Sequence, residues 1–146
     1  MISDIQKLRE MTGAGVMECK KALEESGGDF DRAIKFINER GLIKAQSRGG
    51  RKTGAGFLIS YIHNGRIGVM LEIRCETDFV ARSEPFQNLA HEVAMQISAM
   101  APVDTAELLA QPYIKDESIK VEDFIKKIIA QTGENIKVER FCRYEV

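Results

Sequence analysis

The sequence contains no tryptophan and only three cysteines, which are spread along a chain of 146 residues. Cys19, Cys75 and Cys142 form no CxxC pair and no Cys/His cluster with the spacing of metal ligands. We interpret Cys19 and Cys75 as buried thiols in a reducing compartment, because a free cysteine packs as a small hydrophobic residue. No metal site is therefore expected.

Long apolar runs and an excess of basic charge are also missing. No run approaches the roughly 20 apolar residues that span a bilayer, and the N-terminus lacks the order of a signal peptide. The formal net charge of -1 argues against the broad basic surface of a nucleic-acid-binding protein. We expect a soluble cytoplasmic protein that binds neither membranes nor nucleic acid, and contacts to a protein partner remain open.

Motifs for nucleotide binding and covalent catalysis are absent as well. The sequence has no GxxxxGK[ST] phosphate loop, and neither residues 13–15 nor residues 54–56 complete a GxGxxG. His63 and His91 have no Cys or Ser partner at a recognisable spacing, and no pair of carboxylates stands out. We therefore expect no cofactor, no direct nucleotide binding and no enzymatic activity.

Residues 1–43 are predicted to form three short helices. Apolar residues at helical spacing indicate a first helix at about residues 4–11 and a second that stops at residues 27–28. Asp29 can cap a third helix, which Gly41 is expected to close. A bundle of this size is marginal on its own, so few apolar side chains should remain exposed.

The glycine turn at residues 13–15 leads into the second helix. Val16 and Met17 follow this turn directly, and each either packs in the core of the bundle or faces a partner. Both interpretations stay open. Residues 44–54 come later and combine four basic side chains with small and polar residues, which predicts a basic linker. Its charges either keep it solvated or steer it toward an acidic surface.

Residues 55–146 are predicted to form a core domain that begins with a hairpin. Its strands, at about residues 57–63 and 66–76, are joined by Asn64 and Gly65, which suit the two positive φ angles of a type I′ turn. Apolar and polar residues alternate along the second strand. One face of the sheet should therefore be buried and the other mostly exposed to water.

Two helices and a final strand are predicted to complete this core. One helix starts after Ser83 and ends before Pro102, and another covers about residues 121–131. Residues 135–146 alternate again as a strand. The residues expected to share one face of it are Ile136, Val138, Cys142, Tyr144 and Val146. The predicted class is α+β, with a three-stranded antiparallel sheet covered by helices on one face.

The segment CETDFVA, residues 75–81, connects the second strand to the following helix. It places the carboxylate of Asp78 beside the large aromatic side chain of Phe79. Connections between rigid elements often carry function. Phe79 either folds back to cap the start of the helix or faces outward to bind another molecule.

Three segments of the chain resemble the elongation factor Ts family, whose members are nucleotide exchange factors for elongation factor Tu. They are IQKLREMTGAGVMECKKALEESGGDFDRAI at residues 5–34, GVMLEIRCETDFVAR at residues 68–82 and GENIKVERF at residues 133–141. The resemblance covers nearly the whole chain except about residues 101–118, and its first two motifs are long and specific. By this resemblance the chain is identified as a short, single-core member of the family.

The resemblance implies a ubiquitin-associated-like three-helix domain that docks on the GTPase domain of elongation factor Tu, followed by a core that performs exchange. It implies that the tetrapeptide Thr77, Asp78, Phe79 and Val80 promotes GDP release by displacing the magnesium ion. Phe79 would enter an apolar crevice of the partner, with Asp78 acting beside it. The implied docking residues are Leu8, Thr12, Gly13, Ala14, Gly15, Val16, Met17, Lys20 and Arg48.

The chain also departs from the family pattern. Longer relatives carry a helical excursion between the core helix and the final strand, which a short bridge containing Pro102 and Pro112 replaces here. A terminal strand with an unpaired edge would suit a second copy, so we predict a homodimer with Cys142 near its mate. Two alternatives remain: a non-catalytic ubiquitin-associated-like binding module with a ubiquitin-like or ribosome-associated partner, and an RNA-binding factor that uses the basic linker.

Overall fold

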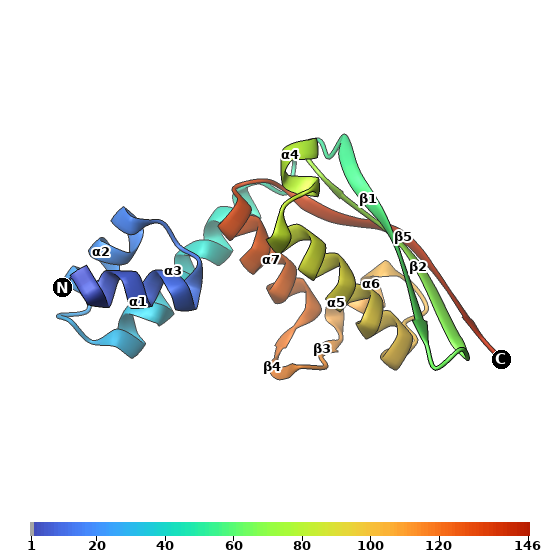
Figure 1. Cartoon of the computed structure of the whole chain (residues 1–146). Helices are drawn as coiled ribbons and strands as arrows, with labels where there is room; N and C mark the ends of the chain where they lie inside the picture. Colours follow the sequence, from blue (N-terminus) through green and yellow to red (C-terminus); the bar gives the residue numbers. More distant parts are fainter. Residues whose placement is uncertain (1) are drawn as a thin grey trace.

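Three N-terminal helices lie to one side of an α+β core in the computed structural model, which describes residues 2–146 (Figure 1). The N-terminal bundle consists of α1 (Ile2–Thr12), α2 (Val16–Glu25) and α3 (Phe30–Ser47). The elements of the core are β1 (Ala55–His63), β2 (Ile67–Cys75), α4 (Asp78–Ala81), α5 (Glu84–Met100), α6 (Thr105–Ala110), β3 (Pro112–Tyr113), β4 (Asp116–Lys120), α7 (Val121–Thr132) and β5 (Ile136–Glu145). The predicted α+β class is confirmed.

The N-terminal bundle has its own small core and the predicted turn chemistry. Its buried residues are Leu8, Cys19, Ala22, Leu23, Ala33 and Ile37. Gly13 takes a φ of 70°, and its N–H donates to the carbonyl oxygen of Arg9, so the glycine ends α1 as a left-handed cap. The Asp29 carboxylate accepts from the N–H of Arg32 at 3.0 Å, which confirms Asp29 as the cap of α3.

The prediction that Gly41 ends the third helix is wrong, because α3 continues to Ser47. Gly41 lies inside the helix where α3 packs against α7. A Cβ at this position would lie 3.2 Å from the Cβ of Ala130. The glycine thus serves close helix packing instead of a cap. Residues 44–47, predicted as part of the linker, are helical, and Ala45 is buried in the core cluster.

The three-stranded sheet has the order β1-β2-β5 and is antiparallel throughout. Asn64 and Gly65 have φ angles of 51° and 65°, which confirms the predicted turn type. The side chains of β2 that alternate inward are buried: Val69, Leu71, Ile73 and Cys75. Helices α5 and α7 cover this face, and the opposite face carries no helix among residues 2–146 (Figure 1).

The prediction for the final strand is wrong in its second half. Ile73 pairs with Val138 while Glu72 pairs with Arg140, so Glu139 forms a bulge with no partner residue. The extra residue reverses the alternation of side chains. Ile136 and Val138 are buried as predicted, but beyond the bulge Cys142, Tyr144 and Val146, which were expected to share their face, are exposed.

The short bridge between α5 and α7 is itself folded into a helix and two strands. Helix α6 spans two turns, and β3 and β4 form a short hairpin. The buried amide of Gln96 holds this hairpin, because it donates to the carbonyl oxygen of Pro112 at 3.0 Å and accepts from the N–H of Ile114 at 2.9 Å. Of the helices described in residues 2–146, none has the length and apolar character needed to cross a membrane.

Candidate functional site

Residues 77–82, which we name the Phe79 turn, contain the short helix α4 and the two residues that cap it. Thr77 precedes α4 with extended backbone angles, and its hydroxyl oxygen accepts from the N–H of Val80 at 3.4 Å. The N–H groups of Ala81 and Arg82 donate back to the carbonyl oxygens of Thr77 and Asp78. The turn therefore has a defined backbone shape.

The Phe79 side chain projects from this turn into solvent and is 86% exposed. Val80 and Ala81, the next two residues, are buried in the core with exposures of 5% and 4%. Asp78 lies on the exposed side of the turn beside Phe79. Phe79 therefore does not cap the core in this structure. Val80 anchors the turn in the core and does not share the exposed surface with Phe79.

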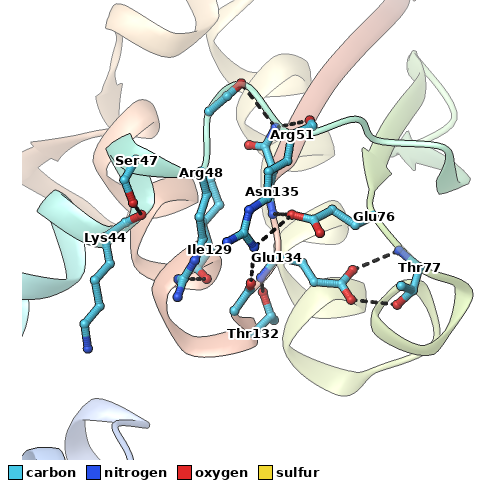
Figure 2. Close-up of polar contacts among 12 residues, drawn as sticks. Lys44, Ser47, Arg48, Arg51, Glu76, Thr77, Ile129, Thr132, Glu134 and Asn135 are labelled. Carbon is cyan, nitrogen blue, oxygen red and sulfur yellow. Dashed lines mark hydrogen bonds and ion pairs between the residues drawn. The ribbon is translucent and has the colours of Figure 1, made fainter.

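Polar contacts from the connection between α7 and β5 hold the base of the Phe79 turn (Figure 2). The Glu134 carboxylate accepts from the backbone N–H of Thr77 at 2.9 Å and from its hydroxyl at 2.7 Å. Glu76, the residue before Thr77, also takes part. Its carboxylate accepts from the N–H of Asn135 at 2.7 Å and lies 3.6 Å from the guanidinium of Arg51. Two consecutive residues of the turn region are thus bound by two consecutive residues of the α7–β5 connection.

The buried thiol of Cys75 belongs to the same region. It donates to the carbonyl oxygen of Thr77 at 3.2 Å. Burial raises the pKa of this thiol to about 11, and the nearby Glu134 carboxylate adds to the increase. The thiol is therefore neutral at physiological pH and acts as a packing group and hydrogen-bond donor, not as a nucleophile.

The docking residues implied by the resemblance fall into two sets. Val16 and Met17 are 49% and 72% exposed at the start of α2, and Gly13, Gly15 and Lys20 are exposed near them in the sequence. Ala14 and Thr12 are half-buried. The structure thus leaves Val16 and Met17 outside the core of the bundle.

Leu8 and Arg48 lie elsewhere. Leu8 is fully buried in the bundle, so its side chain presents no surface to a partner. Its carbonyl oxygen accepts from the hydroxyl of Thr12 at 2.7 Å, which ties α1 to the glycine turn. The Arg48 guanidinium donates to the carbonyl oxygen of Ile129 at 3.4 Å and so packs against the last turn of α7.

Sequence reasoning missed two features of the site. Met11 follows the buried Leu8 at helical spacing, yet its side chain is exposed at the end of α1. Glu134 and Asn135 were noticed only as part of the motif GENIKVERF, without a role. Their contacts to Thr77 and Glu76 join positions almost sixty residues apart, so that no local pattern could reveal them. Within residues 2–146 no group of three or more His, Cys, Asp or Glu side chains is placed to hold a metal ion.

The fold and the site together define an α+β protein in which a helical bundle precedes a core that holds out one aromatic side chain. Comparison with known proteins gives the family. The family model described as Elongation factor TS matches residues 76–146. The chain is 42% identical to Elongation factor Ts of Thermotoga neapolitana, and the match covers 97% of this chain and 94% of that relative. The chain therefore belongs to the elongation factor Ts family of translation elongation factors.

Other relatives agree with this assignment. Elongation factor Ts of Thermodesulfovibrio yellowstonii is 40% identical over 97% of this chain and 94% of its own length. Elongation factor Ts of Rippkaea orientalis is also 40% identical, over 96% of this chain and 75% of its own length. The alignment with the Thermotoga neapolitana protein is 186 residues long against 146 residues in this chain, so that relative has at least 40 aligned positions without a counterpart here. This difference is consistent with the predicted helical excursion of longer relatives.

Proposed function

We propose that this protein is a guanine nucleotide exchange factor that binds GDP-bound elongation factor Tu and promotes GDP release by displacing the magnesium ion, without covalent chemistry. The observation that carries the proposal is the Phe79 side chain, 86% exposed on a turn whose base is held at two consecutive residues, Glu76 and Thr77. An aromatic group exposed to this degree is costly in water and suits an apolar crevice of a partner. The relatives named Elongation factor Ts support the same reading.

The magnitudes show how the work is divided in this proposal. Burying a phenylalanine side chain contributes about 1.5 to 3 kcal/mol, which corresponds to a tenfold to hundredfold effect at about 1.4 kcal/mol per decade. Stronger acceleration requires the loss of the magnesium ion's interaction with the phosphates. The exposed Asp78 carboxylate is adjacent to Phe79 and brings negative charge to that site. By linkage, GDP weakens the binding of this protein by the same factor by which this protein weakens GDP binding.

The N-terminal bundle supplies affinity in this scheme. Val16 and Met17 offer apolar surface next to the basic side chain of Lys20. Leu8 contributes indirectly, because it fixes the position of the glycine turn, and Arg48 contributes by holding the end of α3 on α7. Docking by the bundle keeps the Phe79 turn at its target while the nucleotide leaves.

We also propose that the protein forms a homodimer through the uncovered face of its sheet. The strand register places Ile62, Gly68 and Tyr144 in one row of this face, and Met70 beside Cys142 in the next. Ile62, Met70 and Tyr144 are exposed, and such a patch is typical of an interface. Sedimentation velocity at micromolar concentration tests this, and a single monomer species would contradict it.

The variant Phe79→Ala tests the exchange function. We expect it to bind elongation factor Tu with nearly parental affinity, because the bundle is intact, and to lose about tenfold to hundredfold in the stimulated release rate. Stopped-flow release of labelled GDP measures the rate. The matched control is Val103→Ala, which shortens another exposed apolar side chain on a different connection. Release by Phe79→Ala at the parental rate would show that the wedge assignment is wrong.

A second measurement separates the exchange factor from a non-catalytic binding module. An exchange factor forms a stable complex with nucleotide-free elongation factor Tu, and added GDP dissociates that complex. Gel filtration with and without GDP detects both states. A complex that persists after GDP is added, or the absence of any complex, would favour a binding module with another partner.

A further inference from the structure

We propose that Glu134 is the positioning residue of the Phe79 turn, and that its grip on Thr77 sets the direction in which Phe79 meets the partner. This inference rests on the proposed exchange function. It adds to the site a residue that lies more than fifty positions from Thr77 in the sequence. In this proposal Glu134 acts through Thr77 and not on the nucleotide. The observations that carry it are the two contacts from one carboxylate to one residue (Figure 2).

Both oxygens of the Glu134 carboxylate are used on Thr77. One accepts from the backbone N–H at 2.9 Å, and the other accepts from the side-chain hydroxyl at 2.7 Å. Hydrogen bonds to an ionised acceptor are shorter and stronger than those between neutral groups. Two such contacts fix the rotation of the residue as well as its distance. Thr77 is therefore held both through its main chain and through its side chain.

The Phe79 turn needs an external brace because it is too short to hold itself. Helix α4 has only four residues, and a first helical turn fixes several dihedral angles for very few hydrogen bonds. The bond from the N–H of Val80 to the Thr77 hydroxyl is long, at 3.4 Å. Burial of Val80 anchors one side of the turn, and Glu134 anchors the other. Phe79 lies between these two anchors.

Glu134 itself stands on rigid supports. It follows Gly133, which ends α7 with a φ of 78° and donates to the carbonyl oxygen of Ile129 at 2.9 Å. The N–H of Glu134 donates to the hydroxyl of Thr132 at 3.4 Å. The carboxylate therefore extends from the end of a packed helix, and it can transmit a fixed position to the turn.

A second tie runs in parallel through the neighbouring residue. The N–H of Asn135 donates to Glu76, and its side-chain amide donates to the carbonyl oxygen of Arg51 at 2.9 Å. Arg51 lies in the segment that follows α3, which comes from the docking bundle. The connection between α7 and β5 thus holds the base of the Phe79 turn and the exit from the bundle together. A change at Glu134 should affect the turn, while Asn135 keeps the two parts in register.

The test uses three variants of the full chain: Glu134→Ala, Glu134→Gln and the control Glu139→Ala. Glu139 is an exposed carboxylate in β5, the strand that follows Glu134 in the chain. It pairs with Lys137 and does not bind the turn. We expect Glu134→Ala to reduce the GDP release rate at saturating concentration by about tenfold, with affinity for elongation factor Tu changed by less than about threefold. Glu139→Ala should match the parent in both quantities.

Glu134→Gln serves as the rescue variant. Its amide oxygen can still accept from the N–H of Thr77 and its amide nitrogen can donate to the Thr77 hydroxyl, so most of the release rate should return. A role limited to fold stability predicts instead that affinity and rate fall together with the thermal midpoint. Parental release by Glu134→Ala, or a parallel loss of affinity and rate, would overturn the proposal.

A measurement without the partner keeps this inference distinct from the proposed function. The N–H groups of Ala81 and Arg82 close the turn, and their hydrogen exchange in the free protein reports its stability. We expect about tenfold faster exchange in Glu134→Ala and no change in Glu139→Ala. If the parent fails to accelerate GDP release from elongation factor Tu, the proposed function is wrong, while this measurement still tests the brace. Unchanged exchange in Glu134→Ala would refute the brace even if the parent is active.

Discussion

The glycine turn of the N-terminal bundle and the Phe79 turn of the core are built in different ways around a similar device. In each, a buried cysteine approaches a carbonyl oxygen of the turn: Cys19 lies 3.8 Å from that of Ala14, and Cys75 lies 3.2 Å from that of Thr77. The glycine turn obtains its shape from a backbone with positive φ and ends in two apolar side chains of intermediate to high exposure. The Phe79 turn presents one aromatic group and is braced by carboxylate contacts.

This difference suggests a division of labour. In the proposed exchange function, several modest apolar contacts on a small bundle supply affinity, because each adds a little buried area whether or not the nucleotide is present. In the same proposed function, one aromatic group on a braced turn sets the release rate, because its position decides whether it enters the partner's apolar crevice. Variants of the two turns should therefore affect different quantities.

The double variant Val16→Ala with Met17→Ala should have the largest effect. It removes apolar area from the proposed docking surface, and we expect about thirtyfold weaker binding of elongation factor Tu, or about 2 kcal/mol. The release rate at saturation should stay parental, the reverse of the result for Phe79→Ala. Titration of labelled elongation factor Tu and stopped-flow release measure the two quantities. A fall in the saturated rate with unchanged affinity would remove the division of labour.

A pair of glycine variants gives the next largest effect. Gly13 and Gly133 both have positive φ, at 70° and 78°, so alanine at either position should lower the free energy of unfolding by about 1 kcal/mol. At Gly13 a Cβ also lies 2.9 Å from the Gln131 side chain, which must move, whereas at Gly133 the space is open. We expect Gly13→Ala to weaken affinity and Gly133→Ala, next to Glu134, to slow release. Urea denaturation with the same binding and release assays checks this, and identical functional profiles would contradict it.

The smallest effect concerns the two buried cysteines at alkaline pH. Burial raises the pKa of both thiols, that of Cys75 from 9.0 to about 11. Because the unfolded thiol loses its proton first, the stability that Cys75 contributes is complete below about pH 9 and falls as the pH rises to about 11. The free energy of unfolding of the parent minus that of Cys75→Ala should therefore decrease over this interval. The free energy of unfolding of the parent minus that of Cys19→Ala should decrease less over the same interval. A decrease as large as that for Cys75 would contradict the expected difference between the two thiols.

Much of the fold could be predicted from local patterns. Asn64 and Gly65 specify a hairpin turn through their own backbone preferences, and Asp29 caps α3 with its own side chain. Gly41 was misjudged because a glycine permits both a helix end and a close helix contact, and only the position of Ala130 decides between them. The bulge at Glu139 depends on the register with β2, which the sequence of one strand does not contain.

Only part of the candidate site could be predicted, because here too local patterns do not specify tertiary contacts. The position of Phe79 between a strand and a helix, together with the resemblance, pointed to the segment, but its outward direction depends on Val80 being buried beneath it. Leu8 was grouped with the docking residues because it lies in the same motif, although its side chain is fully buried. Glu134 contacts Thr77 across the tertiary fold, so no local sequence pattern reveals this contact.

The continuous course of α3 from the bundle into the core has a consequence for how the two contact regions combine. A flexible linker would let the second contact search a large volume, and its effective concentration would depend mainly on linker length. Here α3 packs along α7 and Ala45 is buried in the core, so the distance between the glycine turn and the Phe79 turn is nearly constant. If both turns contact elongation factor Tu as proposed, the protein acts as a rigid bivalent ligand, which gains greatly from a target with matching spacing and very little from any other.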